Sequence, residues 1–347
     1  MVRARRRILL VGFGNVGREF ARLILERRGQ LAREHGLDPV VVGILTARHG
    51  SVERASGIDL RRAVRAAEAG GSIEACGRPV RDASVDAVRR IRADVMIEVT
   101  SLRIASAQVA LDHLLAALAS GKHVITANKG PVVYHYRRLA ELARTKRLGF
   151  RFEGTVMDGA PVFSLFLEAM RGARIESFEG ILNSTSNLVL SEIEAGRTYD
   201  EAVAAARAIG LLETDPAMDL DGWDATVKAC LLANVLMGGA LRPEDVPRQG
   251  VSSVDATAVR GARVDGRRLA QVARGWREGR SVKAAVAIEV LAPDQPLFPV
   301  TGTSSSLLAR TDMLKEFQII ERNPGLRQTA YALYADLIAI HEGRLAP

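Results

Sequence analysis

Three glycines near the start of the chain constrain its fold more than any other feature. The turn Gly12-Phe13-Gly14-Asn15-Val16-Gly17 follows an apolar run and precedes a stretch, residues 18–28, with apolar residues at helical spacing. In a dinucleotide-binding fold the first glycine permits a tight turn and the second lets the backbone approach a pyrophosphate. The third lets the helix pack closely on the strand. Because the chain has 31 glycines, the strand and helix around the turn carry this prediction, rather than the glycine spacing alone.

Strands and helices alternate from this turn to about residue 149, which predicts a doubly wound parallel sheet of the Rossmann type. Beyond it the pattern changes, and we expect an α+β domain that includes a capping box at Thr198 and a hairpin about Gly279. The predicted domains are 1–149, completed by the C-terminal segment 306–347, and 150–305. The expected strands are 6–11, 40–45, 95–99, 123–126, 151–156, 175–182, 270–276 and 282–291. The expected helices are 18–28, 85–92, 107–120, 161–171, 198–209, 221–237 and 328–341, with a connection at 238–261.

Composition and charge exclude several classes of protein. Hydrophobic residues make up 48% and charged residues 25% of the chain, which is typical of a globular protein. No apolar run approaches the ~20 residues of a membrane helix, and the N-terminal apolar run is too short for a signal peptide. We therefore expect a cytoplasmic protein without a membrane partner. Cys76 and Cys230 have no neighbours at metal-ligand spacing, so we interpret both as free thiols.

The net charge of +8 attracts polyanions non-specifically but does not indicate specific nucleic-acid binding. The basic residues are 42 arginines and only six lysines, and the arginines are scattered along helical stretches rather than gathered in one block. We therefore expect no nucleic-acid partner. The lysines are Lys122, Lys129, Lys146, Lys228, Lys283 and Lys315.

The end of the second predicted strand indicates which dinucleotide the turn holds. NAD-binding folds usually place an acidic residue there for the adenosine 2′-hydroxyl, whereas an arginine can pair with a 2′-phosphate. This chain has Thr46-Ala47-Arg48-His49, with no carboxylate before Glu53. We therefore predict NADP as the preferred cofactor and NAD as the alternative. Arg48 as one more surface arginine is the competing interpretation.

A polar segment in the second half points to catalysis. Asp224 and Lys228 are four residues apart, so they share one face of a predicted helix that continues into an apolar, buried run. The chain uses arginine seven times as often as lysine, so a lysine at this position suggests a role that arginine could not fulfil. Lysine can donate a proton when desolvated, whereas arginine stays protonated. Lys129 is a second such lysine, at the expected carboxyl edge of the parallel sheet. An ordinary helical salt bridge beside a capping Asp221 is the alternative.

The chain resembles the homoserine dehydrogenase family over most of its length. The resemblance is carried by the glycine turn, by Gly121-Lys122-His123-Val124-Ile125-Thr126-Ala127-Asn128-Lys129-Gly130-Pro131 and by Glu179-Gly180-Ile181-Leu182-Asn183. The most specific motif is Glu213-x-Asp215-Pro216-x-x-Asp219-x-x-Gly222-x-Asp224-Ala225-x-x-Lys228. The family reduces L-aspartate 4-semialdehyde to L-homoserine with NAD(P)H, on the route to threonine, methionine and isoleucine. The resemblance is to the short form of this family, so we expect no C-terminal regulatory ACT domain.

The resemblance implies roles for particular residues. Lys129 and Lys228 are candidate proton donors to the developing alkoxide, and Asp224 orients Lys228. Substrate-binding residues are Glu213 and Asp219, which hold the ammonium group, with Thr185 and Ser184 against the substrate. Cofactor-binding residues are Gly12, Phe13, Gly14, Asn15, Val16, Gly17, Arg48, Thr100 and Lys129. The second domain is expected to bind substrate, carry catalysis and form a homodimer.

The family also carries a monovalent-cation site, Na⁺ or K⁺, built from one glutamate and backbone carbonyls. Glu153, Val156, Asp158 and Ala160 occupy the matching places, and oxygen ligands suit a hard cation. A plain strand-to-helix turn is the alternative.

The chain departs from the family at Met157-Asp158, where small residues are usual, at Ser184, where glycine is usual, and at Leu211, where tyrosine is usual. Two other functions are therefore weighed. One is a related dehydrogenase of another small amino-acid aldehyde or hydroxy acid, and the other is a non-catalytic dinucleotide-sensing homologue. Aspartate semialdehyde dehydrogenase is disfavoured because it needs a nucleophilic cysteine in a reactive setting.

Overall fold

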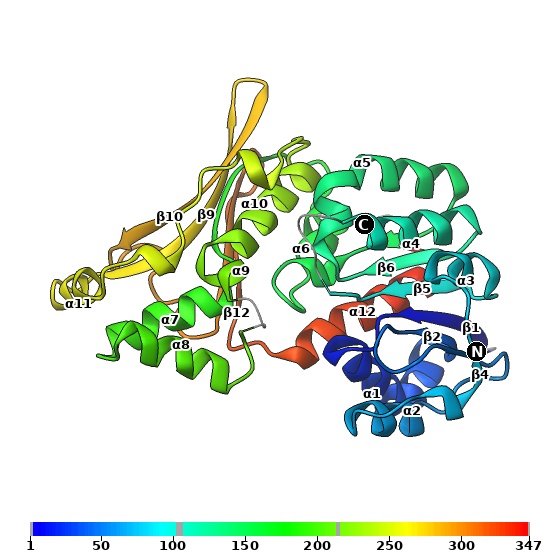
Figure 1. Ribbon diagram of the computed structural model, residues 1–347. Coiled ribbons are helices and arrows are strands. Elements are labelled where there is room, and N and C mark those ends of the chain that lie inside the picture. The colour runs from blue at the N-terminus through cyan, green and yellow to red at the C-terminus, as the bar shows by residue number, and fades with distance from the viewer. Residues whose placement is uncertain (1–2, 102–106, 213–215, 346–347) are drawn as a thin grey trace. The chain divides into compact units, whose positions relative to one another are not determined.

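A computed structural model describes residues 3–101, 107–212 and 216–345. The described residues form two compact units, one of those up to residue 164 together with those from 325 onward, and one of those between 165 and 324. The boundaries between the units lie at 164/165 and 324/325, further along the chain than the limits of 149/150 and 305/306 expected from the sequence. Figure 1 labels the helices and strands of both.

The first unit is built on a seven-stranded sheet of order β4-β3-β2-β1-β5-β6-β7. Neighbours from β2 to β7 are parallel, whereas the short strands β3 and β4 pair antiparallel at one edge. The order reverses at β1, which pairs with β2 on one side and with β5 on the other, so ligands are expected outside the carboxyl ends of these strands. The strands are β1 (Ala4–Val11), β2 (Leu37–Leu45), β3 (Val52–Glu53), β4 (Arg78–Pro79), β5 (Val95–Glu98), β6 (His123–Thr126) and β7 (Phe150–Arg151).

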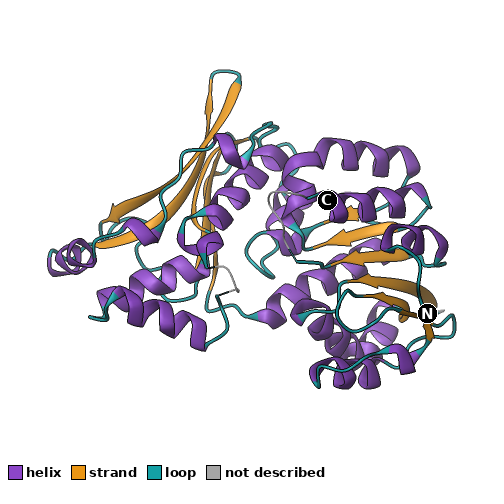
Figure 2. Cartoon of the chain, viewed as in Figure 1, coloured by secondary structure: helices purple, strands orange, loops and turns teal. Residues whose placement is uncertain are grey.

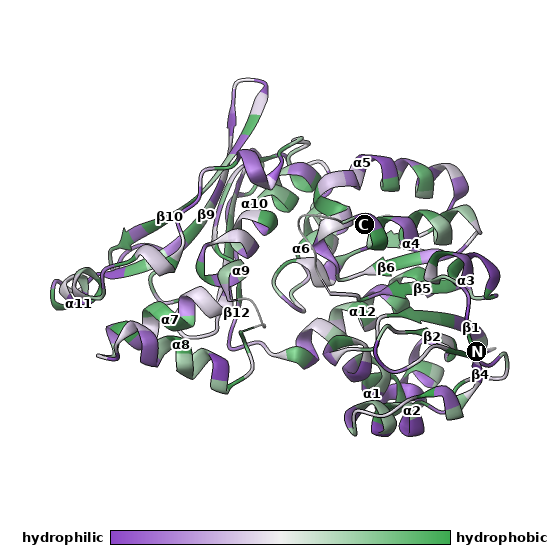
Figure 3. Ribbon diagram, in the orientation of Figure 1, coloured by the Kyte–Doolittle hydropathy of each residue, from purple (hydrophilic) through white to green (hydrophobic). Residues whose placement is uncertain are grey.

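Helices cover both faces of this sheet, as the parallel pairing requires. On one face Ile8 and Leu10 of β1 share a buried core with α1, α2 and α12. On the other face lie α3, α4 and α5 (Figure 1), and Figure 3 shows the hydrophobic colour of β5 and β6 between the layers. The fold class predicted from the sequence is confirmed. The helices are α1 (Asn15–Gln30), α2 (Leu60–Glu68), α3 (Ser84–Arg90), α4 (Gln108–Ala119), α5 (Lys129–Lys146), α6 (Val162–Ser164) and α12 (Leu326–His341).

The second unit contains an antiparallel sheet of order β10-β9-β8-β11-β12. Helices α7 and α10 contact β9, and Figure 2 shows the long hairpin of β9 and β10 in orange. The strands are β8 (Ile175–Ile181), β9 (Arg268–Glu278), β10 (Ser281–Leu291), β11 (Ser305–Thr311) and β12 (Lys315–Glu321). The helices are α7 (Ser184–Glu194), α8 (Tyr199–Ala208), α9 (Ala217–Leu220), α10 (Trp223–Leu236) and α11 (Ala256–Val264).

Three expectations from the sequence differ from the structure. Residues 305–321 do not return to the first unit, because β11 pairs with β8 and β12 and so completes the antiparallel sheet. In place of the strand expected at 151–156, the structure has β7 followed by a 3-10 turn at Glu153–Thr155. There the Glu153 N–H donates to the Asp336 side chain rather than to a neighbouring strand. The connection at 238–261 contains the start of α11, which the Asp255 side chain caps at Thr257 N.

Within the ranges that the structure describes, we find no helix with the length and apolar character needed to cross a bilayer.

Candidate functional site

The predicted cofactor residues lie together at one edge of the parallel sheet. The glycine turn follows β1, Arg48 follows β2, Thr100 follows β5 and Lys129 follows β6. These four strands are neighbours and parallel, so their carboxyl ends meet at the same edge. This edge includes the point where the strand order reverses, which is where open α/β sheets bind their ligands.

Two glycines of the turn are required by close backbone packing, and the third lies beside open space. Gly12 has φ +101°, and a Cβ on it would lie 2.6 Å from the Val99 carbonyl group. A Cβ on Gly17 would lie 2.6 Å from the Gly12 oxygen, so this glycine lets α1 approach the turn. A Cβ on Gly14, in contrast, would meet nothing within 4 Å, so the space beside its backbone is open.

The start of α1 suits a phosphate. Its N-cap, Gly14, has no side chain to cap the first N–H groups, and the first turn of this helix contains no acidic residue. The positive end of the helix dipole is therefore available to a pyrophosphate. Arg18, which the sequence analysis did not single out, adds a cation here. Its guanidinium donates to the Phe13 oxygen at 3.3 Å and to Asn15 Oδ1 at 2.8 Å.

Arg48 and Lys129 occupy different settings at this edge. Arg48 is exposed in the turn between β2 and β3, where its backbone N–H donates to Thr46 Oγ1 at 3.4 Å. Lys129 is half-buried and is the first residue of α5, directly after Asn128, whose side chain caps the helix at Gly130 N. Both residues are therefore anchored through backbone and capping contacts at a sheet edge.

A compact polar cluster lies in the second unit around the start of α10. The Lys228 ammonium is 2.9 Å from Asp224 Oδ2 and donates to the Leu182 carbonyl at 2.6 Å. The two side chains are only 14% and 11% exposed, so this pair is not an ordinary surface salt bridge. Ser184 and Thr185 form the first turn of α7, next to Leu182 in the chain. Glu213 lies outside the described residues.

Asn183 joins the carboxylates of this cluster, although the sequence analysis gave it no role. Its Nδ2 donates to Asp219 Oδ1 at 2.8 Å and to Asp224 Oδ2 at 3.0 Å. Its Oδ1 accepts from Ser186 N at 2.7 Å and so caps α7. The available signal was an Asn between an apolar strand and a run of Ser and Thr, which is typical of an N-cap.

The predicted cation site is a turn that already uses its carboxylate. Glu153 accepts hydrogen bonds from Phe163 N at 2.6 Å, Ser164 N at 2.9 Å and Ser164 Oγ at 2.7 Å. Burial is the main cause that raises the pKa of Glu153, and the negative charge of nearby Asp336 raises it further. The Ala160 carbonyl accepts from Val162 N at 2.8 Å. Capping of α6 therefore accounts for the Glu153 geometry without a cation.

Both cysteines are free and buried. Burial raises the pKa of the Cys230 thiol to about 12 and also raises that of Cys76. A nucleophilic cysteine needs a lowered pKa and an accessible thiolate. The structure therefore offers no reactive thiol at either position.

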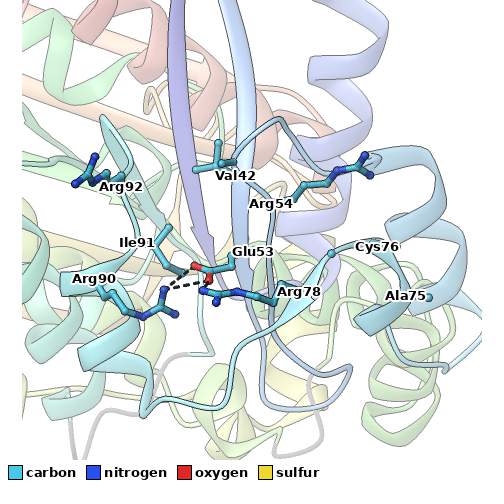
Figure 4. Close-up of a pocket in the computed structure, with 11 residues that line it drawn as sticks. Val42, Glu53, Arg54, Ala75, Cys76, Arg78, Arg90, Ile91 and Arg92 are labelled. Carbon is cyan, nitrogen blue, oxygen red and sulfur yellow. Dashed lines mark hydrogen bonds and ion pairs between the residues drawn. The ribbon is translucent and has the colours of Figure 1, made fainter.

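A pocket of about 670 Å³ in the first unit lies at the antiparallel edge of the sheet (Figure 4). Glu53 forms ion pairs with Arg78 and Arg90 in it, and Arg90 also pairs with Asp82. Because carboxylates already pair with these arginines, and none of the predicted site residues lines this pocket, we do not assign it to the reaction. It is lined by Val42, Glu53, Arg54, Ala55, Ala75, Cys76, Gly77, Arg78, Arg90, Ile91 and Arg92.

Comparison with known proteins gives consistent matches over almost the whole chain. A family model described as homoserine dehydrogenase matches residues 161–338, and one described as the homoserine dehydrogenase NAD-binding domain matches residues 12–153. The NAD(+)-dependent homoserine dehydrogenase of Pseudomonas canavaninivorans is 35% identical over 97% of this chain and 96% of its own length.

Solved structures agree with these matches. The structure of a putative homoserine dehydrogenase from Archaeoglobus fulgidus is 28% identical, with a TM-score of 0.85, and covers 98% of this chain and 99% of that one. A hyperthermophilic archaeal homoserine dehydrogenase in complex with NADPH is 29% identical, with a TM-score of 0.80, and 97% of each chain is covered.

Proposed function

The chain belongs to the homoserine dehydrogenase family and is an NAD(P)-dependent oxidoreductase, and on this premise we propose which of its residues carry the reaction. The reaction is the reversible reduction of L-aspartate 4-semialdehyde to L-homoserine, on the route to threonine, methionine and isoleucine. The observation that carries the assignment is the cluster in which Asn183 holds Asp219 and Asp224 beside Lys228.

The first unit holds the cofactor. The glycine turn and the uncapped start of α1 take the pyrophosphate, and Thr100 and Lys129 line the same sheet edge. Bound NAD(P)H supplies a hydride to the aldehyde carbon. Arg48 supports NADP over NAD because its guanidinium is exposed beyond β2, where a 2′-phosphate is recognised. The two relatives differ here, since one is named NAD(+)-dependent and the other was solved with NADPH.

The second unit binds the substrate. Asp219, with Glu213, holds the ammonium group, because an ionised carboxylate attracts a cation and Asn183 fixes the position of the Asp219 carboxylate. Ser184 and Thr185 open α7, whose N-terminal end favours negative charge, so they suit the substrate carboxylate. The substitution of Ser184 for the usual glycine adds a hydroxyl at this position.

Lysine supplies the proton that the alkoxide needs. Lys228 is the stronger candidate, since Asp224 and the Leu182 carbonyl fix its ammonium from two directions. A fixed cation also stabilises negative charge as it develops on the substrate oxygen. Lys129, at the cofactor edge, is the second candidate donor and a cofactor-binding residue.

Three further assignments complete the proposal. A monovalent cation, Na⁺ or K⁺, at Glu153, Val156, Asp158 and Ala160 stays a prediction, and no step depends on it. The second unit forms a homodimer, supported by the exposed apolar side chains of Met313, Leu314, Phe317 and Ile320 on and before the edge strand β12. A cytoplasmic location follows the sequence expectation.

An absorbance assay tests the proposed function. Protein mixed with NADP and L-homoserine should produce the reduced-nicotinamide band, whereas L-serine and L-threonine should not. A response to another amino alcohol or hydroxy acid alone would assign a related dehydrogenase. Cofactor binding by calorimetry, without turnover on any of these substrates, would assign a dinucleotide sensor.

A further inference from the structure

One buried carboxylate lies at the cofactor edge without a role in the chemistry above. Glu98 is the last residue of β5 and is 0% exposed. Its carboxylate accepts from Thr100 N at 3.1 Å, from the Thr100 hydroxyl, and from Thr126 Oγ1 at 3.2 Å. Burying an ionised carboxylate away from water costs free energy unless hydrogen-bond donors surround it. Here the donors lie at the carboxyl ends of two neighbouring strands, β5 and β6.

These hydrogen bonds tie the turn after β5 to the turn after β6. Thr126 Oγ1 also accepts from Asn128 N at 3.0 Å. Asn128 Nδ2 in turn donates to the Thr100 oxygen at 3.2 Å. The carboxylate of Glu98 therefore lies at the centre of a closed set of contacts joining Thr100, Thr126 and Asn128.

Each side of this set adjoins a cofactor-binding residue. On one side, Gly12 packs so closely against Val99 and Thr100 that a Cβ on it would lie 2.6 to 2.9 Å from their backbone atoms. On the other side, the Asn128 side chain caps α5, whose first residue is Lys129, by accepting from Gly130 N at 3.1 Å. A displacement of Thr100 or Asn128 would therefore change both the glycine turn and the start of the lysine helix.

We propose that Glu98 is a positioning residue for the cofactor: its carboxylate fixes Thr100 and Asn128, and through them the glycine turn and Lys129. This inference rests on the proposed function of the sheet edge. Burial raises the pKa of Glu98 to about 7, although the hydrogen bonds from Thr100, Thr126 and Asn128 favour the charged form and oppose that rise. Glu98 acts through its neighbours Thr100 and Thr126, whose groups donate to its carboxylate.

The test compares cofactor binding and turnover in Glu98→Gln and Thr126→Val. Glu98→Gln keeps the shape but replaces one acceptor oxygen with a donor, and Thr126→Val removes the hydroxyl that links Glu98 to Asn128. We expect each to raise the NADP dissociation constant, measured by calorimetry, about tenfold, the size of one charge-assisted hydrogen bond. kcat should fall, whereas the KM for L-homoserine should stay unchanged. Thr126→Ser, which keeps the hydroxyl, should restore NADP binding.

Asp94→Asn is the matched control, because Asp94 binds Arg7 at the opposite end of β5. It should leave NADP binding and kcat unchanged even if it lowers the melting temperature. Wild-type NADP affinity in both folded Glu98→Gln and Thr126→Val would overturn the inference, and if Glu98→Gln fails to fold, Thr126→Val with its serine rescue decides. Failure of the wild-type protein to bind NADP or NAD would instead contradict the proposed function.

Discussion

The ammonium of Lys228 lies 2.9 Å from the carboxylate of Asp224, one helical turn earlier on α10. Surface ion pairs contribute little to stability, and buried ones are retained at a desolvation cost. This pair is largely buried, its lysine also binds the Leu182 carbonyl, and its aspartate also binds Asn183. These contacts favour a functional pair over the ordinary helical salt bridge that the sequence left open.

Lys228→Ala should lower kcat about 10² to 10⁴-fold, the usual contribution of a general acid, with a smaller change in the KM for L-homoserine. Lys228→Arg should be nearly as inactive, because arginine keeps the charge but does not release a proton at neutral pH. Steady-state kinetics measure both. Lys283→Ala is the control, since Lys283 lies on β10 in an exposed pair with Glu278. Near-normal turnover of Lys228→Ala would remove this residue from the mechanism.

Lys129→Ala should raise the KM for NADP and lower kcat at least tenfold, because it removes the amine at the start of α5 beside the cofactor edge. The comparison is Lys146→Ala, at the other end of the same helix, where Nζ bonds the Ala119 oxygen. Kinetics with NADP as the varied substrate measure the effect. If the two variants behave alike, Lys129 has no role in binding or proton transfer.

Asn183→Ala should lower kcat/KM for L-homoserine about 10- to 100-fold, since it removes hydrogen bonds to two carboxylates. Asn234→Ala is the comparison, because it removes a buried amide of α10 whose Nδ2 donates to the Leu241 carbonyl and whose Oδ1 accepts from Leu241 N. It should lower the melting temperature while kcat/KM is retained. Equal kinetic losses in the two variants would indicate a purely structural role for Asn183.

Arg48→Ala should raise the KM for NADP about 10- to 100-fold, the effect of losing a charge-assisted contact to phosphate, and leave the KM for NAD within about twofold. Arg54→Ala, an exposed arginine that bonds Ser56, is the control. A wild-type preference for NAD, or equal effects of Arg48→Ala on the two cofactors, would show that Arg48 is a surface residue.

Glu98 should make the protein less stable as the pH rises toward neutrality. Its pKa in the folded protein, about 7, lies above the ordinary 4.5 because burial disfavours the charge. Protonation therefore favours the folded state, and this contribution is complete below about pH 4.5 and lost as the pH rises through 7. Urea unfolding at pH 4.5 to 8 should show a decline that is smaller in Glu98→Gln. An identical pH dependence in the two proteins would exclude this contribution.

Much of the fold could be predicted because strong local signals agree with it. The apolar run before Gly12 is β1, and the capping box at Thr198 and Glu201 opens α8 as expected. Strands β11 and β12 were missed because their place in the second sheet is set by pairing with β8, far away in the sequence. The strand expected at 151–156 ends early because Asp336, from α12, takes the Glu153 N–H.

The site was predictable at the level of residue types and only partly at the level of contacts. Spacing placed Asp224 and Lys228 on one helix face, which the structure shows. The roles of Asn183 and Glu98 depend on partners 36 and 28 residues away, which spacing does not reveal. For Glu98 the available signal was a carboxylate inside the buried apolar strand at 95–99, a position where charged residues are rare unless paired.

The proposed reaction is tested most directly when the cofactor and the product are measured in the same mixture. L-aspartate 4-semialdehyde is incubated with NADPH and the protein, with NADPH measured by absorbance and L-homoserine by chromatography. We expect one L-homoserine formed per NADPH oxidised, and almost none with Lys228→Ala. Absence of L-homoserine in the presence of folded, NADPH-binding wild-type protein would contradict it.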